Sequence, residues 1–232
     1  MKSFKILASI LVLLILIVIV GIQGLYLYKI NELQPKKLST EYKHNKFAID
    51  ALWASTGDVG AIDIEAYSSI ELVFGFAKLV TGSDSTNYEE NFPVGFRLTG
   101  LVARNIAFER NLKNNWRLNN AVISIWVSNN YSAREALNYL LSTGYYGYNQ
   151  ESFAEAAEFY FGKHEDHLSL SETVSLIAIQ NGASVFNPYC RKNLLSKRGQ
   201  YLNRQLTKYD EKTYGSFIFR LPNFVIHPEI KC

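Results

Sequence analysis

Residues 145–188, YYGYNQESFAEAAEFYFGKHEDHLSLSETVSLIAIQNGASVFNP, decide the fold of this 232-residue chain because they carry two helical patterns in succession. Asn149 is a suitable N-cap for the first helix, and Gly162 suits the left-handed conformation that ends a helix. The residues between them predict a helix with one apolar face. Its apolar positions are Phe153, Ala156, Ala157, Tyr160 and Phe161.

The second helix of this stretch begins at a predicted capping box. Ser169 and Glu172 have the spacing at which each side chain bonds the backbone N–H of the other residue. Apolar residues then follow at helical spacing as far as Ile179, and Gly182 is the predicted stop. Periodicity alone therefore predicts two packed helices of an α domain.

The same stretch resembles the C-terminal half of the bacterial peptidoglycan glycosyltransferase domain, glycosyltransferase family 51. The family's Tyr-Phe/Tyr-Gly turn, Ala-Ala-x-x-Tyr-Phe-Gly-Lys helix end, Leu-Thr-Leu-x-Glu-x-x-x-Leu motif and closing Asn-Pro occur in order. They fall on Tyr145, Tyr146, Gly147, Ala156, Ala157, Tyr160, Phe161, Gly162, Lys163, Leu168, Leu170, Glu172, Leu176, Asn187 and Pro188. The resemblance implies a mainly α, lysozyme-like glycosyltransferase domain.

The N-terminus carries a long apolar run, in which only Ser9 is polar between Ile6 and Val20. A helix from Ile6 to Tyr28 would span roughly 34 Å, enough for a bilayer core of about 30 Å. A cleaved signal peptide has a shorter apolar run, of about 7–15 residues, so we expect an uncleaved, single-pass anchor. Lysines flank both ends, and the resemblance alone implies a bacterial inner-membrane protein whose domain lies on the extracytoplasmic side.

Four parts are predicted along the chain. They are a membrane anchor over residues 1–30, a polar linker over 31–46, a glycosyltransferase-like domain over 47–213 and a C-terminal extension over 214–232. Alternating apolar residues in the extension suit either a terminal strand or a packed extension. Residues 81–92 are polar and contain glycine, which is typical of a loop.

The charge of the chain bears on nucleic-acid binding, and its cysteines bear on disulfide formation. The chain has 24 basic and 21 acidic residues, and a net charge of +3 without a basic run gives no case for nucleic acid. Cys190 and Cys232 are the two cysteines. Either a disulfide in an oxidising compartment or two free thiols fits this spacing.

Three residues are candidates for binding substrate or phosphate. The family's glycine-rich motif falls on residues that keep Thr99 and place Arg104 at a lysine position, and its Arg-Lys motif keeps Arg117. The resemblance implies that such cations hold the donor pyrophosphate, for which the planar guanidinium is well suited. Arg110 and Lys113 are expected on the same helical stretch. The alternative is that all these cations are ordinary solvated helix residues.

No cofactor is expected. Many family members use a divalent metal near the acid of the Arg-Lys-x-x-Glu motif, but Asn120 stands at that position here. The next family helix also loses charge, with Ala133 and Asn138 at its Lys and Glu positions. Ser132 and Glu135 still form a predicted capping box, so that helix should persist.

The family's catalytic acids are missing from the expected register. Its Glu-Asp pair, which supplies the general base, falls on Leu52 and Trp53, and neither side chain can accept a proton. Asp58 and Glu65 are the candidate displaced carboxylates. Asp58 follows a glycine and is typical of a turn. Glu65 and Glu71 are expected in one helix, projecting to different faces as solvated residues.

The sequence shows no other catalytic motif. His164 and His167 are expected in a surface turn rather than a metal site. No Ser-His-Asp arrangement, P-loop or dinucleotide fingerprint is apparent.

Two functions follow from the resemblance. We expect a degenerate relative that binds a lipid-linked precursor, a glycan strand or a cell-wall synthase at the membrane. The alternative is an active glycosyltransferase that polymerises lipid II with non-standard catalytic residues.

Overall fold

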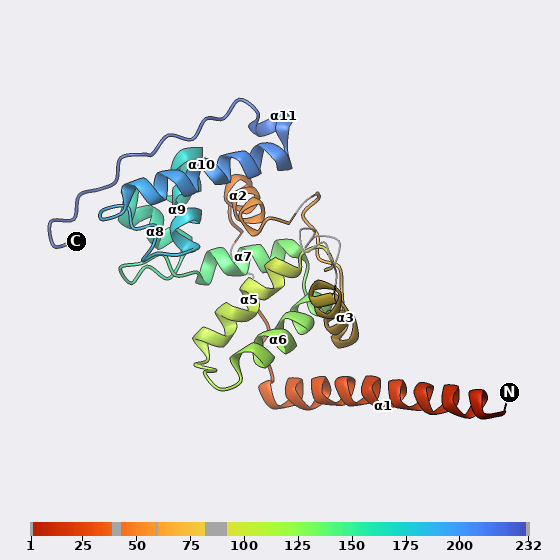
Figure 1. Cartoon of the computed structure of the whole chain (residues 1–232). Coiled ribbons are helices and arrows are strands. Elements are labelled where there is room, and N and C mark those ends of the chain that lie inside the picture. Colours follow the sequence, from red (N-terminus) through yellow and green to blue (C-terminus); the bar gives the residue numbers. More distant parts are fainter. Residues whose placement is uncertain (1, 39–42, 59, 82–91, 231–232) are drawn as a thin grey trace. The chain divides into compact units, whose positions relative to one another are not determined.

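The computed structural model describes residues 2–38, 43–58, 60–81 and 92–230 (Figure 1). Helices dominate these ranges, and no β-strand occurs in them, so the mainly α prediction is confirmed. The helices are α1 (Lys2–Leu33), α2 (Lys46–Thr56), α3 (Ser69–Thr81), α5 (Phe96–Glu109), α6 (Trp116–Asn130), α7 (Ala133–Thr143), α8 (Phe153–Phe161), the 3₁₀ helix η1 (Glu165–His167), α9 (Leu170–Gln180), α10 (Lys192–Tyr209) and α11 (Glu211–Tyr214).

The chain divides into two compact units. Unit 1 comprises Met1–Lys36 and Glu65–Asn130, and unit 2 comprises Lys37–Ile64 and Tyr131–Cys232. Helices α1, α3, α5 and α6 belong to unit 1, and the remaining helices belong to unit 2. The predicted part boundaries at residues 30, 46 and 213 stay predictions.

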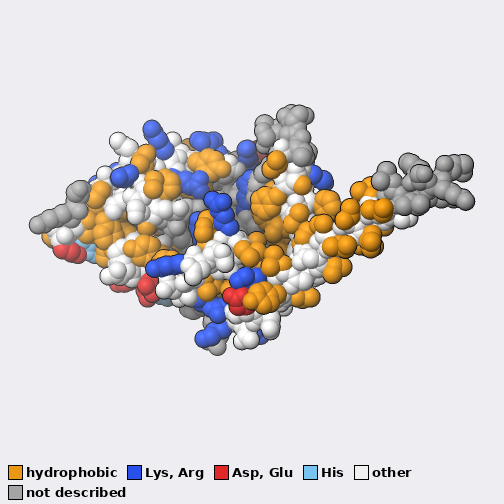
Figure 2. Space-filling model, turned by 60° about the horizontal axis from the view of Figure 1, so that its bottom comes forward, with side chains coloured by type: hydrophobic (Ala, Val, Ile, Leu, Met, Phe, Trp, Pro, Cys, Tyr) orange, Lys and Arg blue, Asp and Glu red, His pale blue; other side chains and the backbone are white. Residues whose placement is uncertain are grey.

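Helix α1 is the one described helix that is long and apolar enough to cross a membrane. Within its segment Ser9–Leu33, the most apolar stretch of 18 residues has a mean hydropathy of 2.9. Its side chains from Ile10 to Val18 are about half exposed or more, and Figure 2 shows hydrophobic side chains covering its projecting part. Such a surface is unfavourable in water and favourable in a bilayer core.

The core of unit 1 is aromatic. Tyr67, Leu72, Phe92 and Ile125 form a buried cluster, and Phe96 packs against it. The Phe92 and Phe96 rings stack with centroids 4.4 Å apart and planes 15° apart. Helices α1 and α3 both pack within this unit, so the N-terminal helix is joined to the part of the chain that follows residue 65.

The two helices predicted from residues 145–188 are present as α8 and α9 in unit 2. Gly162 ends α8 in the left-handed conformation, with φ of 62°. The Ser169–Glu172 capping box begins α9. The predicted N-cap at Asn149 is wrong, because Ser152 accepts the capping hydrogen bond. Helix α9 ends at Gln180, two residues before the predicted glycine stop.

The C-terminal tail is a packed extension, and no strand occurs in its described part, residues 215–230. Phe219 is 7% exposed, and its ring lies directly over Gly199 of α10. Further along, the Val225 N–H donates to the Tyr160 carbonyl of α8 over 2.9 Å. The tail thus covers α10 and then α8, as the blue trace in Figure 1 shows.

Two other predictions fall partly on residues that are not described. Cys190 is disulfide-bonded, while Cys232 lies outside the described residues. Of the expected loop over residues 81–92, positions 82–91 also lie outside them.

Candidate functional site

Unit 1 contains two neighbouring pockets. They share residues that lie just before helix α3 and in its first turn. The larger has a volume of about 620 Å³ and the smaller about 390 Å³. Ala66, Tyr67 and Glu71 line both. The larger pocket is also lined by Glu65, Phe74, Gly75, Lys78, Phe92 and Pro93.

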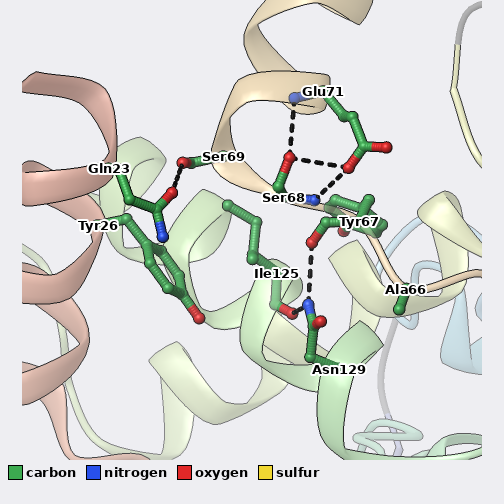
Figure 3. A pocket seen from close by; sticks show the side chains of 9 residues that line it. All are labelled: Gln23, Tyr26, Ala66, Tyr67, Ser68, Ser69, Glu71, Ile125 and Asn129. Atoms are coloured by element: carbon green, nitrogen blue, oxygen red, sulfur yellow. Dashed lines mark hydrogen bonds between the residues drawn. The ribbon is translucent and has the colours of Figure 1, made fainter. Parts of the chain in front are cut away.

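The smaller pocket involves the apolar helix (Figure 3). Gln23 and Tyr26 of α1 line it opposite residues at the start of α3 and on α6. The Ser69 hydroxyl donates to the Gln23 side-chain oxygen over 2.9 Å. A glutamine in an apolar helix requires such a partner, because an unpaired amide is costly to bury. This hydrogen bond fixes α1 against α3.

Glu65 is the candidate carboxylate that the structure places at a pocket. It lies in the extended segment before α3, and its N–H donates to the Val94 carbonyl over 3.0 Å. Its carboxylate accepts from the Val94 N–H over 3.2 Å. The expectation that Glu65 and Glu71 share one helix and face apart is wrong. Helix α3 begins only at Ser69, and both glutamates line the larger pocket.

The Glu71 side chain caps the N-terminus of α3. The Ser68 N–H and hydroxyl donate to its carboxylate over 2.6 and 2.8 Å, and the Glu71 N–H donates back to the Ser68 hydroxyl. These hydrogen bonds hold the pKa of Glu71 below the ordinary value for glutamate. A carboxylate with a lowered pKa is a weaker proton acceptor, so Glu71 is poorly suited to general-base catalysis.

Thr99 lies beneath the pockets. Its side chain is fully buried on α5, and its hydroxyl lies 2.8 Å from the Tyr67 hydroxyl. The Thr99 hydroxyl also lies 2.9 Å from the Phe96 carbonyl, to which it donates. Because Tyr67 lines both pockets, Thr99 supports the pocket wall through Tyr67.

The predicted phosphate-binding cations lie elsewhere in unit 1. Arg104 is exposed on α5, and Arg117 is exposed in the first turn of α6 beside the Trp116 ring. Neither lines the two pockets. Arg110 does not continue a single helical stretch with them, because α5 ends at Glu109. Its guanidinium instead donates to the Leu33 carbonyl over 2.6 Å.

Asp58 belongs to unit 2 and forms a local turn. The Thr56 hydroxyl lies 2.9 Å from the Asp58 carboxylate and 3.1 Å from the Asp58 backbone nitrogen. Leu52 and Trp53, which the resemblance places at the positions of the family's acids, are core residues of α2, with Leu52 2% exposed and Trp53 fully buried. Of the two candidate carboxylates, Glu65 lines a described pocket and Asp58 lines neither.

The residue that the resemblance places at the family's metal position does not fit a divalent ion. Asn120 offers a neutral amide oxygen, which is buried without a hydrogen-bond partner. Divalent magnesium or calcium is held chiefly by carboxylates, and one amide oxygen does not neutralise its charge. Among the described residues, no group of three or more His, Cys, Asp or Glu side chains is arranged to hold a metal.

Unit 2 brings together three side chains that the sequence analysis did not connect. The Ser142 hydroxyl lies 2.9 Å from His44 Nε2, and the Glu165 carboxylate lies 3.1 Å from His44 Nδ1. The sequence analysis excluded only a Ser-His-Asp arrangement, and it did not predict this set, in which the carboxylate is a glutamate. No motif spacing could have revealed it, because Ser142 and Glu165 follow His44 by 98 and 121 residues.

Comparison with known proteins gives the family. Residues 97–207 match the model of the family described as Transglycosylase. Penicillin-binding protein 2D of Bacillus subtilis is 32% identical over 111 residues, and penicillin-binding protein 1A of Aquifex aeolicus is 27% identical over 113 residues. Penicillin-binding protein 1A of Vibrio cholerae is 29% identical over 138 residues.

These alignments cover 48%, 48% and 59% of this chain. The chain in turn spans only 16% of the length of each of the three relatives. The match includes α5 to α9 and most of α10, and thus the capped helices α8 and α9 from which the resemblance was first inferred. Residues 97–207 of this chain therefore belong to the transglycosylase family, glycosyltransferase family 51.

Proposed function

We propose that this chain is a membrane-anchored relative of the peptidoglycan glycosyltransferases that binds a lipid-linked glycan precursor without polymerising it. Glycan strands and a cell-wall synthase are further partners under the same proposal. In this proposal α1 crosses the bacterial inner membrane once and the rest of the chain lies on its extracytoplasmic side. The observation that carries the proposal is the burial of Leu52 and Trp53, the two residues that the resemblance places at the positions of the family's acids.

The loss of these acids argues against glycosyl transfer. The attacking sugar hydroxyl must give its proton to a titratable group within hydrogen-bond reach. A positioned general base commonly contributes about 100-fold or more to the rate. Leucine and tryptophan at 2% and 0% exposure offer no such group and no route for a substrate to reach them.

The larger pocket suits an amphiphilic ligand. Phe74, Phe92 and Pro93 provide apolar walls, while Glu65 and Glu71 provide carboxylates that accept hydrogen bonds from sugar hydroxyls. Two carboxylates and one lysine make the pocket itself unfavourable for a pyrophosphate.

Arg117 is better placed to receive the phosphates. It lies in the first turn of the 15-residue helix α6, where the helix dipole also favours an anion. Its guanidinium can donate two parallel hydrogen bonds to one phosphate.

A second candidate function is catalysis with Glu65 as the base. Its support is the position of the Glu65 carboxylate at the larger pocket, beside Glu71 and Lys78. In that case Glu65 would accept the proton, while Glu71 remains occupied with capping α3.

Fluorescently labelled lipid II in detergent micelles tests the binding proposal. We expect the full chain to bind it and the Arg104→Ala, Arg117→Ala double variant to bind it roughly 10-fold or more weakly, since a charge-assisted hydrogen bond contributes about 1.5–3 kcal/mol. The matched control is Arg134→Ala with Arg204→Ala, which removes two exposed arginines of unit 2. Equal affinities of the two double variants would refute the phosphate site, and absence of binding by the native chain would refute the proposed function.

A further inference from the structure

The Ser142, His44 and Glu165 side chains form a hydrogen-bonded relay within unit 2. His44 directly precedes the N-cap of α2, Ser142 lies in the last turn of α7, and Glu165 begins η1. Both Glu165 carboxylate oxygens lie 3.1 Å from His44 Nδ1, and Ser142 Oγ lies 2.9 Å from His44 Nε2. One imidazole therefore connects a carboxylate to a serine hydroxyl through its two nitrogens.

The chemistry of the three groups sets the direction of these hydrogen bonds. An ionised carboxylate only accepts, so His44 Nδ1 carries the proton that is donated to Glu165. In the neutral ring, Nε2 is then the acceptor, and the Ser142 hydroxyl donates to it. This is the arrangement in which a histidine takes the proton of an attacking serine.

The imidazole is held firmly in this orientation. The His44 and Glu165 side chains are each 1% exposed. The backbone N–H of His44 donates to the Asn138 side-chain oxygen over 3.0 Å, and the Phe153 ring packs edge-on against the imidazole. The Asn45 side-chain amide donates to the backbone carbonyl of Glu165 over 3.3 Å, and this hydrogen bond holds the backbone of Glu165 in place.

Ser142 is the member of the relay that solvent can reach. Its residue is partly exposed, whereas the other two are buried. A nucleophile must lie where a substrate can reach it, and Ser142 is the one relay residue that is partly exposed. None of the three relay residues lines either of the two pockets described in unit 1.

We propose that Ser142 is a nucleophile, activated by His44 and with Glu165 as a positioning residue, that accepts the acyl group of a small ester. Ser142 Oγ attacks the carbonyl carbon while its proton passes to His44 Nε2. The ester C–O bond then breaks, and the leaving alcohol takes that proton, so that Ser142 carries the acyl group as an ester. Attack by water, again giving its proton to Nε2, releases the carboxylic acid and restores the serine hydroxyl.

The experiment uses p-nitrophenyl acetate and the full chain in detergent. Peptide mass spectrometry follows acetylation of Ser142 over time, and Ser196, a partly exposed serine of α10, is the internal control. We expect Ser142 to acetylate about 100-fold or more faster than Ser196, which is the usual contribution of a positioned base. We expect His44→Gln to remove most of this advantage, and Glu165→Asp to retain more of it than Glu165→Gln.

The native chain alone decides the proposal, whether or not the variants fold. Acetylation of Ser142 no faster than that of Ser196 in the native protein would overturn it. Unchanged Ser142 acetylation in a His44→Gln variant with native circular dichroism would overturn it as well. Both results are independent of glycan binding, because the probe contains no sugar or phosphate.

Discussion

The contact between Gly199 and Phe219 makes the packing of the C-terminal tail testable. A Cβ added at Gly199 would lie 2.2, 2.3 and 2.7 Å from three atoms of the Phe219 ring. These separations are far shorter than van der Waals contact, so either the ring or the helix must move. Since α10 is a regular helix at this point, we expect Gly199→Ala to displace the ring and the tail residues around it.

The magnitude follows from two opposing effects. Alanine stabilises a helix interior by about 1 kcal/mol relative to glycine. Expelling a buried phenylalanine costs about 1.5–3 kcal/mol, and Phe219 is only 7% exposed. We therefore expect Gly199→Ala to lower the free energy of unfolding by roughly 0.5–2 kcal/mol. In a Phe219→Ala background the same substitution should instead raise it by about 1 kcal/mol.

Urea denaturation of the detergent-solubilised chain, followed by circular dichroism, measures this double-mutant cycle. Gly100→Ala is the matched control, because Gly100 lies inside helix α5 and a Cβ there would meet nothing within 4 Å. It should stabilise the chain by about 0.5–1 kcal/mol. The reasoning is refuted if Gly199→Ala stabilises as Gly100→Ala does, or if removing the Phe219 ring leaves its effect unchanged.

Three further perturbations address single interactions. Ser132→Ala removes the cap of α7 and should cost about 1 kcal/mol in urea denaturation, whereas an unchanged midpoint would contradict the capping role. Tyr214→Phe leaves the buried Asp50 carboxylate without its 2.6 Å hydroxyl donor and should cost about 1–3 kcal/mol, measured as a lower melting temperature; an unaltered melting temperature would argue against this bond. Burial raises the pKa of Glu172, but hydrogen bonds from Lys163 and Ser169 outweigh it and lower the pKa below the ordinary 4.5. The native chain should therefore have a higher free energy of unfolding than the Glu172→Gln variant, fully so above pH about 4.5. This difference should disappear as the pH falls through the lower pKa of Glu172 in the folded state, and a difference independent of pH would contradict the reasoning.

Local signals in the sequence predict the helices well where they are strong. The capping boxes at Ser132 and Ser169 and the glycine stop at Gly162 are all present. Asn149 failed as a cap because it adopts a positive φ of 61° in the turn before α8, which leaves Ser152 to accept the capping bond. Both residues qualify chemically, so the choice depends on the path of the preceding turn.

The start of α3 carries a local signal in the sequence. Ser68 and Glu71 have capping-box spacing, and their reciprocal hydrogen bonds begin the helix after Glu65 rather than before it. The two glutamates therefore lie on different elements and can line one pocket. The relay of Ser142, His44 and Glu165 differs, because only the tertiary fold brings residues so distant in sequence together.

The central claim, binding without polymerisation, is tested most directly by incubating the full chain with labelled lipid II and magnesium and separating the products by size. The account predicts bound lipid II and no glycan polymer above a protein-free control, because the residues that the resemblance places at the family's acids, Leu52 and Trp53, lie in the core of α2. Polymer formed by the native chain and abolished by Glu65→Gln would contradict it and would assign the general base to the larger pocket of unit 1.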